Sequence, residues 1–106
     1  MDTKTQADII TAAVEKYGHI HQMMKAMEEM GELERAIARM IEHNLETKDP
    51  EPPELIENLI EETADVWIMV KQLTFILGVD LVTEAEAQKL RRLAERMGMD
   101  IGEAAP

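Results

Sequence analysis

Two short acidic motifs in this chain combine residue types and a spacing that suit metal chemistry. The first is EEMGEL and the second, further along, is EETADVW. Each holds a carboxylate pair three residues apart, Glu29 with Glu32 and Glu62 with Asp65. Residues three apart on a helix share one face, with Cβ atoms about 5–6 Å apart, so two such helices side by side would direct four carboxylates at one point. Like charges this close repel one another unless a cation lies among them, and the spacing therefore predicts a divalent metal site.

The surroundings of the motifs favour this interpretation over ordinary surface charge, which is what a single E-x-x-E on a helix usually represents. Glu29 and Glu32 border an apolar stripe of methionine and leucine side chains. Asp65 directly precedes the apolar run VWIMV, where a free carboxylate would face a large desolvation cost. Asp is also a poor residue for the middle of a helix. Metal ligation gives these carboxylates a physical reason to be there.

The ligand set indicates which metal to expect. The chain has no Cys, and carboxylate oxygens suit a hard ion, Mg²⁺ or Mn²⁺. Since Mg²⁺ is commonly held by a few carboxylates and substrate phosphates, the site favours phosphoryl or pyrophosphoryl chemistry. Di-iron helix bundles use Glu-x-x-His pairs instead, and none of His19, His21 and His43 has a Glu three positions before it.

The elements that must position these residues are predicted to be helices. Gly18 and Gly78 mark the ends of the first and third helices, and Asn44 is expected to terminate the second. Thr83 with Glu86 forms a capping box that would open the fourth. We therefore predict an all-α bundle of about four helices, two of them carrying the acidic site: residues 5–17, 19–43, 54–77 and 83–98, followed by a frayed tail over 99–106.

Length and composition set the class of protein. The chain of 106 residues fits one domain, residues 1–106, and 45% hydrophobic residues are enough for a core. A net charge of −11 argues against binding nucleic acid or an anionic membrane. No signal peptide and no apolar run of about 20 residues are visible. With no Cys, a reducing cytoplasm is the expected location.

The third predicted helix carries a second signal, for self-association. Residues 66–77 are apolar nearly all round, and a helix of this kind must be covered on every side. A chain this small has few other helices to do so. We therefore expect a homodimer or homotetramer, in which Trp67 lies in the core or the interface rather than stacking on a base.

The two motifs, taken with their flanks, resemble a known family. YGHIHQMMKAMEEMGEL, EETADVWIMVKQL and QKLRRLAERM together resemble the MazG-like all-α nucleoside triphosphate pyrophosphohydrolases, over most of the chain from Val14 to Met97. Both acidic motifs occur in the family's order. Their separation is at the long end for the family, because of the loop ETKDPEPP. The resemblance implies Mg²⁺-dependent hydrolysis of a (deoxy)nucleoside triphosphate to the monophosphate and pyrophosphate.

The resemblance also implies roles for individual residues. Glu29, Glu32, Glu62 and Asp65 match the family's Mg²⁺ ligands. Glu28 matches an accessory acidic position and could orient a ligand or the attacking water.

Four further residues are candidate substrate contacts, and each has a structural alternative. Lys25 could contact a substrate phosphate or form an i, i+4 ion pair with Glu29. Gln22 could hydrogen-bond the nucleotide or be an ordinary surface residue. Lys89 and Arg92 could meet the triphosphate or pair with neighbouring glutamates.

Two other functions are compatible with these residues. One is a non-catalytic helical module whose acidic patch contacts a basic partner or an unhydrolysed ligand; thermal melting against Mg²⁺ or Mn²⁺ distinguishes a ligand-binding site from a diffuse acidic surface. The other is a related pyrophosphohydrolase acting on dUTP or phosphoribosyl-ATP. Only a substrate panel separates that one, because base selectivity depends on pocket contacts that spacing does not supply.

Overall fold

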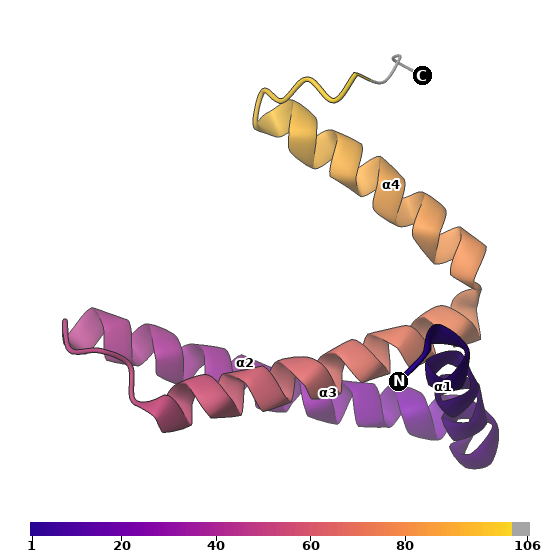
Figure 1. Cartoon of the computed structure of the whole chain (residues 1–106), viewed down its shortest axis with the longest axis horizontal. Coiled ribbons are helices and arrows are strands. Elements are labelled where there is room, and N and C mark those ends of the chain that lie inside the picture. The colour runs from indigo at the N-terminus through magenta and orange to yellow at the C-terminus, as the bar shows by residue number, and fades with distance from the viewer. Residues whose placement is uncertain (103–106) are drawn as a thin grey trace. The chain divides into compact units, whose positions relative to one another are not determined.

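The computed structural model of the chain describes residues 1–102, and within them every regular element is an α-helix (Figure 1). The predicted all-α class with four helices is confirmed. The last four residues of the predicted tail, 103–106, lie outside the described part. The helices are α1 (Thr3–Tyr17), α2 (His19–Glu46), α3 (Pro53–Leu77) and α4 (Val79–Arg96).

The chain divides into two compact units. The first unit runs from Met1 to Ile76 and contains α1, α2 and nearly all of α3. The second begins at Leu77 and contains α4. Both acidic motifs belong to the first unit.

The first helix has clear signals at both ends. The Asp2 carboxylate accepts a hydrogen bond from the Thr5 backbone N–H at 2.7 Å, which caps the N-terminus of α1. Gly18 adopts φ 89° and its N–H donates to the Val14 carbonyl at 2.8 Å, so the predicted glycine stop is confirmed. A residue with a side chain would be strained at this positive φ.

The second helix continues past its predicted end. Asn44 does not terminate it: the residue lies inside the helix, and its side-chain amide donates to the Met40 carbonyl at 2.8 Å. The helix ends instead at Glu46, and the Thr47 N–H donates to the His43 carbonyl.

The fourth helix begins one turn earlier than its capping box predicts. Gly78 breaks the chain with φ 113° and α4 starts at Val79, which places Thr83 inside the helix. At the other end Gly98 takes φ 71° and the Met99 N–H donates to the Ala94 carbonyl at 2.9 Å. This arrangement closes the helix close to where a glycine stop is predicted, and it ties the first residue of the predicted frayed tail to the helix.

The most buried side chains of α2 and α3 are polar, small or flexible. The side chains of Gln22 on α2 and Gln72 on α3 are buried and hydrogen-bonded to each other. The buried hydrophobic residues nearby are small or flexible, namely Ala26, Ala36 and Met69. By contrast, many large apolar side chains of these helices are exposed in the single chain. They include Ile20, Met24, Met27, Ile41, Ile60 and Trp67.

Candidate metal centre

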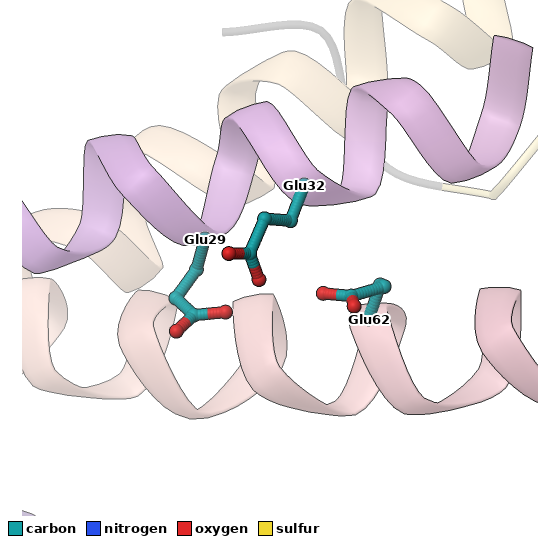
Figure 2. Close-up of side chains that lie close together, drawn as sticks. All are labelled: Glu29, Glu32 and Glu62. Carbon is teal, nitrogen blue, oxygen red and sulfur yellow. The ribbon is translucent and has the colours of Figure 1, made fainter.

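Three of the four predicted carboxylate ligands meet in the space between α2 and α3. Glu29 and Glu32 project from neighbouring turns of α2 toward α3, and Glu62 projects back from α3 (Figure 2). One carboxylate oxygen from each residue lies within 4.8 Å of the others. The three-residue spacing puts the α2 pair on one helical face, and the pairing of the helices supplies the third carboxylate.

The site is partly withdrawn from water. The Glu29 side chain is only 12% exposed. One oxygen of Glu29 and one of Glu62 are buried without a hydrogen-bond partner among the described residues. A buried acceptor without a partner is costly, more so when it is charged. These two oxygens are therefore free to bind a cation.

The electrostatics of the site follow from this geometry. Burial raises the pKa of the Glu62 carboxyl above its usual value, and the negative charges of Glu32, Asp65 and Glu29 raise that pKa further. Each of these causes penalises the ionised form. A bound cation would oppose them all, because it favours ionised carboxylates.

The distances fit a hard divalent ion. Two oxygens bound to one Mg²⁺ at about 2.1 Å each can be at most about 4.2 Å apart. The three oxygens here lie within 4.8 Å of one another, so side-chain movements of about an ångström would bring all three within bonding distance of one ion. All three donors are carboxylate oxygens, the type that Mg²⁺ and Mn²⁺ prefer.

Asp65 is placed at the edge of this group rather than within it. Its side chain is exposed, and it is not one of the three residues whose oxygens converge. It lies one turn beyond Glu62 on α3, close enough for its charge to raise the pKa of Glu62. Spacing puts Asp65 on the same helical face as Glu62, but in this structure its carboxylate is not among the converging oxygens.

Lys25 occupies the other side of the site as an ion-pair partner. Its ammonium group lies 3.2 Å from a Glu29 oxygen and 3.5 Å from a Glu28 oxygen. The hydrogen bond to Glu29, followed by the charges of Glu28 and Glu29, raises the pKa of Lys25. The i, i+4 ion pair with Glu29 is thus present. The Glu28 side chain is 60% exposed, so its carboxylate also faces solvent.

Gln22 lies inside the protein, where its amide is already engaged. It is 5% exposed and its Nε2 donates to the Oε1 of Gln72 at 2.6 Å. The ring of His21 completes the contact, with Nδ1 lying 2.7 Å from the Oε1 of Gln22. We did not single out Gln72 from the sequence; its only signal there is a polar residue inside an otherwise apolar helix.

The two basic candidates Lys89 and Arg92 belong to the second unit. Both are exposed on α4. Lys89 lines an open hollow together with Glu86, Leu90 and Arg96, so charged and apolar side chains alternate there.

Comparison with models of known protein families, with curated proteins and with solved structures found no match to this chain. No single helix in the described range is long and apolar enough to cross a membrane; only α3 and α4 counted together, across the break at Gly78, reach the required length and composition.

Proposed function

We propose that this protein is a Mg²⁺-dependent pyrophosphohydrolase, which cleaves (deoxy)nucleoside triphosphates to the monophosphate and pyrophosphate. The observation that carries the proposal is the convergence of carboxylate oxygens from Glu29, Glu32 and Glu62. Glu29 and Glu62 each also have a buried oxygen without a hydrogen-bond partner among the described residues. The resemblance of both acidic motifs to the MazG-like family supplies the reaction.

Each residue of the site has a definite task in this mechanism. Glu29, Glu32 and Glu62 would hold Mg²⁺ or Mn²⁺, with Asp65 rotating in as a further ligand. The ion would neutralise phosphate charge and lower the pKa of a water molecule. Glu28, exposed beside the trio, would orient that water. The rigid helices fix the carboxylates relative to one another.

Lys25 would exchange partners when substrate binds. In the structure its ammonium group pairs with both Glu28 and Glu29. With a cation bound to Glu29, Lys25 would be free to contact a phosphate oxygen through a charge-assisted hydrogen bond, which is a strong interaction. Lys89 and Arg92 of the second unit are further candidates for the triphosphate.

We also propose that the protein acts as a homodimer or homotetramer. The support is the exposure of large apolar side chains on α2 and α3, where Ile20, Met27, Ile60 and Trp67 are each more than 60% exposed. Apolar surface of this extent is typical of a protein–protein interface.

Pyrophosphate release from a panel of ribo- and deoxyribonucleoside triphosphates, with and without Mg²⁺, tests the reaction. We expect turnover with Mg²⁺ that the Glu32→Gln variant abolishes. The matched control is Glu34→Gln, which removes an exposed charge from the same helix. Absence of turnover with every nucleotide and divalent ion would refute the enzyme. Ion-dependent thermal stabilisation without turnover would instead support the non-catalytic module.

A further inference from the structure

The buried amide pair Gln22–Gln72 is the most specific contact between α2 and α3 outside the carboxylate site. Gln22 is 5% and Gln72 is 4% exposed, and 50 residues of sequence separate them. Their hydrogen bond is 2.6 Å long. The pair lies on the same two helices as the trio, about two turns away from Glu29 along α2.

The hydrogen bonds around this pair form a directed chain in which each group has a partner. Because the Nε2 of Gln22 donates to Gln72, its Oε1 is left to accept from the Nδ1 of His21. The Nε2 of Gln72 in turn points to the sulfur of Met69 at 3.6 Å. A satisfied buried network stabilises one arrangement of its elements, since any other arrangement leaves buried polar groups unpaired.

The most buried hydrophobic side chains of α2 and α3 supply little to set the register of the two helices. Ala26 and Ala36 have no side chain long enough to interlock with the facing helix, and Met69 is flexible and fits many arrangements. The connection over residues 47–52 can span up to about 20 Å, so it tolerates a slip of one helical turn. Such a slip moves α3 by about 5.4 Å along α2.

We infer that Gln22 and Gln72 are positioning residues, whose hydrogen bond fixes the register of α2 against α3 and thereby brings Glu62 to Glu29 and Glu32. A slip of about 5.4 Å moves Glu62 by one helical turn away from Glu29 and Glu32. In one direction the slip brings Asp65 toward that position, so a wrong register changes the set of carboxylates that meet. A single buried polar pair is known to specify register between packed helices. The inference rests on the metal site of the proposed function, but it does not require turnover.

The test is a set of leucine variants that keep side-chain size while removing the amides. Gln22→Leu and Gln72→Leu singly each leave one buried amide without its partner, which is expected to lower Tm by about 4–8 °C. The double variant removes both amides and is expected to recover most of that loss. Gln88→Leu, on the exposed surface of α4, is the matched control.

Register is measured directly by the distance between two spin labels. The chain has no Cys, so cysteines introduced at Glu42 and Ala64 are the only labelled sites; both positions are exposed and they are offset along the hairpin. Labelled protein diluted with unlabelled protein keeps the measured distance within one chain. We expect one narrow distance in the parent, and in the double leucine variant a second population displaced by about 5 Å.

Mn²⁺ affinity is the second readout, and it separates positioning from mere stability. The double leucine variant is expected to bind Mn²⁺ at least tenfold more weakly than the parent, although its Tm is close to that of the parent. The inference is wrong if the double variant keeps the single parent distance and binds Mn²⁺ as the parent does. The proposed function is refuted if the parent protein binds no Mn²⁺ or hydrolyses no nucleotide. In that case the spin-label distances still show whether the two glutamines fix the register of α2 against α3.

Discussion

Replacing Glu62 with Gln should have opposite effects on the metal-free and the metal-bound protein. Burial and the charges of Glu32, Asp65 and Glu29 raise the pKa of Glu62, which means that its ionised form is disfavoured in the folded state. A neutral amide of the same shape removes this penalty. The Glu62→Gln variant without divalent ions is therefore expected to melt above the parent at neutral pH.

With Mg²⁺ or Mn²⁺ present the order should reverse. An ion at about 100 times its Kd stabilises the folded parent by about 2.7 kcal/mol, which for a chain of this length raises Tm by about 12 °C. Loss of one of three converging carboxylates is expected to weaken ion binding by about 100-fold. Removing a residue that only hydrogen-bonds to a metal ligand already costs up to about 100-fold in metal affinity. At the same ion concentration the variant should then gain only about 2 °C.

Thermal melting followed by circular dichroism, with and without the ion, measures both effects. The matched control is Glu61→Gln, which removes an exposed charge next to Glu62 and should keep the full rise in Tm. NaCl at matched ionic strength corrects for screening. The reasoning is refuted if Glu62→Gln retains the parent's response to the ion, or if NaCl alone reproduces that response.

Four shorter predictions follow from the same structure. In the metal-free protein the pKa of Glu62 is raised, so above about pH 4.5 the folded state binds more protons than the unfolded state. The stability of the protein should therefore fall as pH rises through the pKa of Glu62 in the folded state. Thermal melts over a pH series in the presence of chelator check this sign. Lys25→Gln removes the cation beside Glu29, so calorimetry should show tighter Mn²⁺ binding while a nucleotide titration shows a higher KM; an unchanged KM would exclude Lys25 as a phosphate contact. Ile60→Glu, in the exposed apolar stripe of α3, should halve the mass found by sedimentation if that stripe is an interface. Val14→Ala, at a position only 1% exposed, should cost about 2 kcal/mol in urea unfolding.

Local signals predicted most of the fold. Helical periodicity and the glycines at 18 and 78 act through neighbouring residues alone, and the structure ends α1 and α3 at those glycines. The capping box at Thr83 was wrong because Gly78 already separates the two helices and nothing between it and Thr83 prevents helix formation. A cap signal inside a helix has no free N–H groups to satisfy.

The sequence could predict only those features of the site that depend on one helix, such as which carboxylates share a helical face. The i, i+3 rule put Glu29 and Glu32 on one face of α2, and the structure bears this out. Whether Glu62 or Asp65 reaches that pair depends on how the two helices cross and on side-chain length, and the structure brings in only Glu62. The partner of Gln22 lies 50 residues away, a pairing that no local pattern contains.

The distribution of side chains in the first unit links its stability to its function. Polar carboxylates and amides lie between α2 and α3, while large apolar side chains such as Ile20 and Trp67 face outward. Two of the hydrophobic residues buried in this unit are alanines, Ala26 and Ala36, which gain little from burial. Under the proposed function, folding of the hairpin, binding of a cation between its helices and covering of its apolar surface by a second copy would be linked equilibria. The ion would neutralise the buried carboxylates, and the partner would take the apolar side chains out of water.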